Sequence, residues 1–255
     1  MIKLVNAHDM MIVNYGLLQL KGFLDPFCGC EQIVVCREST DVHGMEWAMC
    51  YGKFKIFVPL NIGMNIIALK CIHFEAKFRV IYKISTSTKR YHVVPVYVIC
   101  ADGSGHFQAP VELTDSGSHA ARKRIIFGMR LLQSLTAENL LAELGERSTF
   151  LLCRDVGQLT DECLIHHSKM SLAEVYEMDP KMVWKKLAQE FYAAYPDGFD
   201  QKKWIAFMAC TRHCTPESAV PDSVQTYEQL LKTTKGYFAL GKFDSFSPAN
   251  FLFFL

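Results

Sequence analysis

Short apolar runs separated by turn residues dominate the first hundred residues of this 255-residue chain. In the run from Phe54 to Leu60, apolar side chains recur at every second position, which is the period of a strand with one buried face. Comparable runs lie at 33–36, 46–51, 65–72, 77–84 and 91–100, and Asn61-Ile62-Gly63 is a candidate tight turn between two of them. This pattern predicts an antiparallel β-sandwich over residues 1–101.

A helical pattern replaces the strand pattern after the sequence Asp102-Gly-Ser-Gly105, which we interpret as a flexible boundary. The next segment predicts a helix that begins at Ser116 or Ser118 and ends at Gly145. Its expected buried stripe is Ala121, Ile125, Met129, Leu132 and Leu135. Further predicted elements are strands at 149–153 and 204–210, a helix opened by Asp179-Pro180, and a short helix at 226–235. We therefore expect an α+β protein whose second domain, residues 102–255, is of the α/β type.

Composition narrows the classes of protein that this chain can belong to. Half of the residues are apolar, 21% are charged and the net charge is +1, which argues against disorder and against a polyanion-binding surface. The N-terminus does not read as a signal peptide, and no apolar run is long enough for a membrane span. Most of the ten cysteines stand singly in apolar segments, which favours free thiols in a reducing, cytoplasmic setting. We expect neither a nucleic-acid partner nor a membrane span.

A catalytic zinc site of the common helical type requires two histidines four residues apart, with glutamate directly after the first. None of the nine histidines is followed by glutamate, and no two are four residues apart. The sequence therefore contains no such motif.

Two Cys-x-x-His spacings, Cys163/His166 and Cys210/His213, are candidates for a structural zinc site. Most cysteines in apolar runs are packing residues, so the alternative is two core thiols with histidines at surface turns. The segment from Cys210 to His213 also suggests a thiolate nucleophile, although its apolar setting favours packing.

Two further features have a functional and a structural interpretation. The basic run Arg122-Lys123-Arg124 suits binding of phosphate or of an acidic partner, or is the solvated side of its helix. Trp47 suits a sugar-binding platform, or is a core side chain of the sandwich.

The order and wording of several segments resemble a eukaryotic zinc metallopeptidase family with fungal and animal members. The stretch WAMCYGKFKIFVPLNIGMNIIALK (47–70) is similar to the opening sandwich of that family. The segments DGSGHFQAP, ARKRIIFGMRLLQSLTAENL, HHSKMSLAEVYEMDP, WIAFMACTRH and TYEQLLKTTKGYFALG then follow in the family's order. The resemblance covers about residues 45–241. It implies a hydrolase with a zincin-like second domain and a zinc cofactor.

The family's His-Glu-x-x-His helix lies downstream of the segment that ends at Gly241, and this chain continues there as KFDSFSPANFLFFL. No metal ligand or catalytic residue is therefore carried over, and whether the chain is an enzyme stays open. We expect a truncated second domain and a chain that neither binds zinc nor cleaves peptides. The alternative is a non-catalytic sandwich module that binds carbohydrate or protein. The apolar terminal segment predicts self-association, and a protein or peptide partner is also expected.

Overall fold

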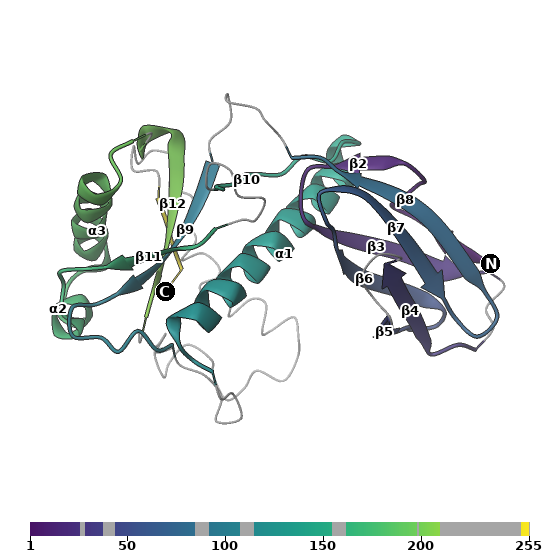
Figure 1. Cartoon of the computed structure of the whole chain (residues 1–255), viewed down its shortest axis with the longest axis horizontal. Coiled ribbons are helices and arrows are strands. Elements are labelled where there is room, and N and C mark those ends of the chain that lie inside the picture. The colour runs from purple at the N-terminus through teal and green to yellow at the C-terminus, as the bar shows by residue number, and fades with distance from the viewer. Residues whose placement is uncertain are drawn as a thin grey trace, which may run out of the picture. The chain divides into compact units, whose positions relative to one another are not determined.

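The computed structural model describes residues 1–25, 29–37, 44–84, 92–107, 115–154, 162–197 and 199–209, together with the strand 251–254 (Figure 1). The chain divides into two compact units. The first contains Met1–Lys89 and Phe127–Leu151, and the second contains Arg90–Ile126 and Leu152–Leu255. The single predicted boundary at residue 101 therefore differs from this division, in which residues 127–151 return to the first unit.

Two sheets form the first unit. One has the order β1 (Ile2–Leu4), β3 (Leu17–Leu24), β6 (Lys53–Pro59), with antiparallel neighbours. The other has the order β2 (Met11–Val13), β8 (Glu75–Tyr82), β7 (Gly63–Lys70), β4 (Gln32–Arg37), β5 (Met45–Ala48), in which only β2 and β8 run parallel. The alternating side chains of both sheets meet in one core. The prediction of a β-sandwich is confirmed.

The predicted reversal at Asn61–Gly63 is present, and its geometry has a clear cause. Gly63 has a φ of +96°, a conformation that glycine adopts without steric cost. The Asn65 side chain accepts a hydrogen bond from the Asn61 backbone N–H at 2.8 Å and donates one to the Asn61 carbonyl at 2.7 Å. These contacts connect β6 to β7.

A mostly parallel sheet forms the centre of the second unit. Strand β9 (His92–Ile99) pairs in parallel with β11 (Leu164–His167) and with β12 (Lys202–Met208), and β12 pairs in parallel with β13 (Phe251–Phe254). The short strand β10 (Leu151–Leu152) also neighbours β9. Parallel strands are usually covered on both faces, which explains the continuous apolar sequence of β9. An α/β arrangement is confirmed for this unit.

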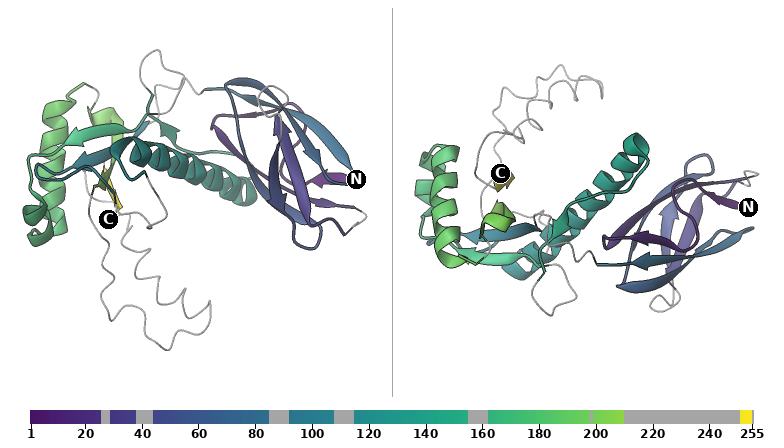
Figure 2. Two further views of the ribbon diagram at one scale, coloured as in Figure 1. Left: turned by 60° about the horizontal axis from the view of Figure 1, so that its bottom comes forward. Right: turned by 90° about the horizontal axis from the view of Figure 1, so that it is seen from above.

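Helices cover both faces of that sheet. On one face lie α2 (Leu172–Glu177) and α3 (Pro180–Ala194) (Figure 2). In the core with β9 and β12, α2 contributes Val175, and α3 contributes Val183, Leu187 and Phe191. The first turns of α1 (Ser118–Leu144) contribute Ala121 to a separate cluster with Tyr97 and Ile99 of β9. Alternate residues of β9 therefore face different helices.

The predicted bounds of α1 are confirmed, but part of its predicted buried stripe is wrong. The helix ends at Leu144, and Gly145 follows with a φ of +76°. Leu132, expected inside, is 40% exposed, whereas Ser134 and Glu138 are buried. The apolar spacing could not reveal this, because Glu138 is buried by partners that are distant in the sequence.

The C-terminal segment contributes a strand to the second unit. Residues Phe251–Phe254 form β13, in register with Trp204–Phe207 of β12. The expected self-association through this segment stays a prediction. The predicted helix at 226–235 lies outside the described residues.

Candidate functional site

His166 is held on the face of β11 that packs against α3. Its imidazole is buried and lies edge-on to Phe191, with ring centroids 4.8 Å apart. The ring Nε2 lies 3.0 Å from Oε2 of Glu190 on α3. Because a carboxylate oxygen is an acceptor, the Nε2–H donates a hydrogen bond to it. A carboxylate in this position fixes the tautomer and the orientation of the ring.

Both oxygens of Glu190 are engaged. While Oε2 accepts from His166, Oε1 accepts a hydrogen bond from the backbone N–H of Lys169 at 3.0 Å. Glu190 thereby joins α3 to the segment that follows β11. Such a histidine–carboxylate pair can orient a general base, and it also stabilises the packing of these two elements.

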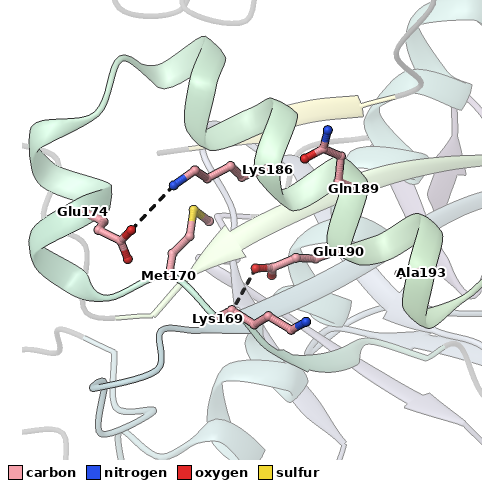
Figure 3. A pocket seen from close by; sticks show the side chains of 7 residues that line it. All are labelled: Lys169, Met170, Glu174, Lys186, Gln189, Glu190 and Ala193. Atoms are coloured by element: carbon pink, nitrogen blue, oxygen red, sulfur yellow. Dashed lines mark hydrogen bonds and ion pairs between the residues drawn. The ribbon is translucent and has the colours of Figure 1, made fainter.

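A pocket of about 330 Å³ opens beside this pair, at the carboxyl end of β11 (Figure 3). Its lining residues are Lys169, Met170, Glu174, Lys186, Gln189, Glu190 and Ala193. In open α/β sheets, ligands bind most often at the carboxyl ends of the strands. The position of the pocket therefore makes it the candidate functional site of this unit.

The charges of the pocket are partly compensated within the protein. Lys186 Nζ lies 3.6 Å from Glu174 Oε1, as the dashed line in Figure 3 marks. The backbone N–H and hydroxyl of Ser171, followed by Lys186, lower the pKa of Glu174. Ser171 and Glu174 form a capping box that begins α2. Glu174 is therefore ionised, caps the start of α2 and lines the pocket.

The chain after β9 is tied to the same region. Asp102 Oδ1 accepts a hydrogen bond from the Leu172 backbone N–H at 2.7 Å, and Ala101 N–H donates to the Met170 carbonyl at 2.9 Å. The buried hydroxyl of Tyr97 donates to the Gly105 carbonyl at 3.1 Å. The segment Asp102–Gly105 makes hydrogen bonds to the first residue of α2 and to β9. That this segment is a flexible boundary stays a prediction.

The predicted zinc ligands Cys163 and His166 lie on opposite faces of the sheet. Cys163 packs with Ala121 of α1, whereas His166 contacts Phe191 of α3. Burial raises the pKa of the Cys163 thiol to about 12, so the thiolate that binds zinc is disfavoured. Cys210 and His213 lie outside the described residues. The structure does not bring Cys163 and His166 together, and the four-residue zinc site stays a prediction without support from this geometry.

The basic run at 122–124 and Trp47, the other candidates from the sequence, make contacts within their own units. Arg122 donates from Nε to the Cys163 carbonyl at 2.7 Å, and its guanidinium lies 3.7 Å from Glu162. The Arg124 guanidinium lies over the Phe107 ring at 5.3 Å. Trp47 packs against the sandwich core, and its indole nitrogen is buried. These contacts favour the structural interpretation of each feature.

Comparison with known proteins identifies the family. A family model described as "Putative peptidase family" (Metallopep) matches residues 1–199. The chain belongs to this peptidase family. No curated protein matches the chain. Among solved structures, a carbohydrate acetylesterase from Xanthomonas citri is 13% identical, with a TM-score of 0.23. That match covers 90% of this chain and 55% of the esterase, so the chain spans about half of the esterase's length.

The family name Metallopep implies a metal, but the described residues do not fit a catalytic zinc ion. Within the part of the chain that the structure describes, no three His, Cys, Asp or Glu side chains converge as a ligand set. His166 and Glu190 bond to each other, and Glu190 has a second bond to the main chain. We therefore assign no step of peptide hydrolysis to the described residues of this family member.

No sequence pattern indicated the pair His166–Glu190 or the pocket beside it. The two residues are 24 positions apart, and no local motif joins them. The one available signal was Ser171-x-x-Glu174, which predicts a helix start at this place. Among the described residues, no helix combines the length and the apolar composition that a membrane span requires.

Proposed function

We propose that residues 1–255 are a member of the peptidase family that does not cleave peptide bonds by itself. One observation carries this proposal: none of the nine histidines is followed by glutamate, and no two are four residues apart. A zinc peptidase needs both a ligand set that holds the ion and a base that activates water. Hydrolysis by the common helical zinc mechanism would thus need a His-Glu-x-x-His motif from outside these residues.

The geometry of the second unit supports the same proposal. Among its described residues, the pair His166–Glu190 is engaged in packing α3 against β11, and burial keeps the Cys163 thiol neutral. We also propose an intracellular location for the chain. In support, all seven cysteines that the structure describes carry free thiols, and Cys30, Cys100 and Cys163 are buried like apolar residues.

The test combines elemental analysis of the purified protein with a peptidase assay, with and without added zinc. We expect less than stoichiometric zinc and no cleavage of a quenched fluorescent peptide library. Stoichiometric zinc together with cleavage that a chelator abolishes would contradict the proposal. A His166→Gln variant then shows whether the described pair contributes to that activity.

A further inference from the structure

Lysine side chains gather on the outer face of the β1–β3–β6 sheet in the first unit. In the antiparallel register, Lys3 of β1 lies opposite Phe23 of β3, and Phe23 lies opposite Lys53 of β6. One step along the sheet, Lys21 lies opposite Lys55. Phe54, between Lys53 and Lys55, faces the core, as do Leu20 and Ile56 beyond them, so these five side chains share the outer face. We call Lys3, Lys21, Phe23, Lys53 and Lys55 the lysine face.

Among the described residues, three of these ammonium groups have no carboxylate within 4 Å. Lys3 pairs with Asp25 and also lies 5.9 Å from the Phe23 ring. Within the described part of the chain, Lys21, Lys53 and Lys55 form no ion pair. The whole chain has 27 basic and 26 acidic residues, so this local excess of positive charge is not a property of the composition.

The register places two like charges directly opposite each other. Side chains opposite each other on neighbouring antiparallel strands have Cβ atoms about 5 Å apart, and like charges there destabilise the sheet. Lys21 and Lys55 are such a pair. Negative charges supplied by a partner would remove this repulsion and gain attraction to both groups. The arrangement thus costs stability in the isolated protein and favours an acidic ligand.

The lysine face is a short platform, because the same sheet is covered further along. Leu17 and Gln19 also point to the outer side, yet both are buried. Asn6 donates from Nδ2 to the Gln19 carbonyl at 2.8 Å and to Glu138 at 2.5 Å, which closes that part of the face. On β6, the outward-facing Phe57 and Pro59 are half-buried, so the part that contains the lysines and Phe23 is the more exposed part of the described face.

The spacing of the platform suits an extended acidic peptide. Residues two apart on a strand, such as Lys53 and Lys55, are separated by about 7 Å, and neighbouring strands by about 5 Å. An extended peptide with an acidic residue at every second position presents its carboxylates at the same interval of about 7 Å on one side. We propose that the lysine face binds an extended, acidic polypeptide segment. This binding does not depend on peptide hydrolysis, so it stands apart from the proposed function.

The platform suits a peptide better than a nucleic acid. Proteins that hold single-stranded nucleic acid combine a long basic groove with several aromatic rings on which bases stack. Here Phe23 supplies one ring, 36% exposed, and the net charge of +1 provides no long-range attraction for a polyanion. An acidic segment needs a few carboxylate contacts and no stacking.

The test measures fluorescence anisotropy of a labelled peptide of alternating glutamate and threonine, added to the whole chain. We expect binding at about 50 mM salt that weakens towards about 300 mM, since screening reduces attraction between exposed charges. The double variant Lys21→Gln/Lys55→Gln should bind about 5-fold more weakly, the loss expected for two exposed ion pairs. A peptide with glutamine in place of glutamate should not bind.

A matched control is the double variant Lys70→Gln/Lys77→Gln on the other sheet of the same unit. It removes the same net charge, but both lysines already lie within 4 Å of Glu75, at 3.6 and 3.8 Å. Its affinity for the peptide should equal that of the wild type. The Lys21/Lys55 variant should also unfold at the same temperature as the wild type or higher, because a repulsive pair is gone. Weaker binding without loss of stability assigns the effect to the face and not to misfolding.

Three outcomes would overturn the proposal. The first is that the acidic peptide does not bind at low salt. The second is that the two double variants weaken binding equally, because the effect would then depend on net charge and not on the lysine face. The third is that a short oligothymidylate of equal charge binds more tightly than the peptide and that its binding depends on the same lysines. The partner would then be a nucleic acid.

Discussion

The surface ion pair between Asp9 and Arg79 is supported by several hydrogen bonds. Asp9 accepts hydrogen bonds from the Arg79 backbone N–H at 2.7 Å and from Nε at 3.1 Å, and it also pairs with Nη2. These contacts join the loop before β2 to the middle of β8. The hydrogen bonds from the Arg79 side chain, followed by that from its backbone, lower the pKa of Asp9 from 3.8 to about 2.

This lowered pKa predicts a specific dependence on pH. A carboxyl group with a lowered pKa in the folded state stabilises that state above its ordinary pKa, and the contribution is lost as the pH falls through the folded value. For Asp9, the contribution is complete above about pH 4 and disappears near pH 2. An NMR titration should show the Asp9 pKa near 2 in the wild type and clearly higher in Arg79→Gln, although still below 3.8, because the backbone N–H of residue 79 keeps its hydrogen bond to Asp9.

Lys77→Gln is the control for this titration, because Lys77 lies on the same strand but pairs with Glu75. It should leave the pKa of Asp9 low. An unchanged pKa in Arg79→Gln would show that the pair does not persist in solution.

At the scale of elements, Glu190 is the link between α3 and the chain after β11. Glu190→Ala would leave the buried Nε2–H of His166 and the Lys169 N–H without their acceptor. We expect a loss of about 1–3 kcal/mol in the free energy of unfolding, the cost of leaving such groups unsatisfied. Urea unfolding measures it.

Glu177→Ala removes an exposed carboxylate from α2 and is the matched control. Its free energy of unfolding should change by less than about 0.5 kcal/mol. Equal effects of the two substitutions would show that the contacts of Glu190 contribute nothing specific.

For the whole molecule, the first unit is assembled from two separate stretches of sequence. Ala137 of α1 lies in the sandwich core, and the adjacent Glu138, 3% exposed, accepts hydrogen bonds from Asn6 at 2.5 Å and Arg147 at 2.8 Å. Beside this network, burial raises the pKa of the Tyr15 hydroxyl. A fragment that ends at residue 101 would lack Ala137, Glu138 and Arg147.

Glu138→Ala should destabilise the sandwich strands as well as α1. Removing one partner leaves the largely buried Arg147 guanidinium without its carboxylate, which costs about 3 kcal/mol. Amide hydrogen exchange should accelerate in β1, β3 and the second half of α1 together, because they belong to one unit.

Glu143→Ala, an exposed position on the same helix, should leave that exchange unchanged. Faster exchange in α1 alone would contradict the assignment of residues 127–151 to the first unit.

The sequence by itself determined most of the elements in this protein. Strands with one buried face appear as alternation, as in β6, and helix ends appear through Gly145 and the pair Asp179-Pro180, because these signals depend on local backbone geometry. The three strands before residue 25 were missed. Strands β1 and β2 have three residues each, which is too short for a clear period, and the first four residues of β3 are all buried and show no alternation. The sequence alone also shows that it contains no His-Glu-x-x-His motif.

Only the tertiary structure decided which distant residues meet. Glu138 is buried because Asn6 and Arg147 surround it, and no local pattern encodes that contact. Likewise, the zinc hypothesis placed Cys163 and His166 together from their spacing, whereas a step of three residues along β11 places them on opposite faces of the sheet. Strand register likewise brings Lys21 opposite Lys55 in a chain of nearly balanced charge. Composition sums charges, but electrostatic energy depends on the distances between them, and those distances exist only in the folded chain.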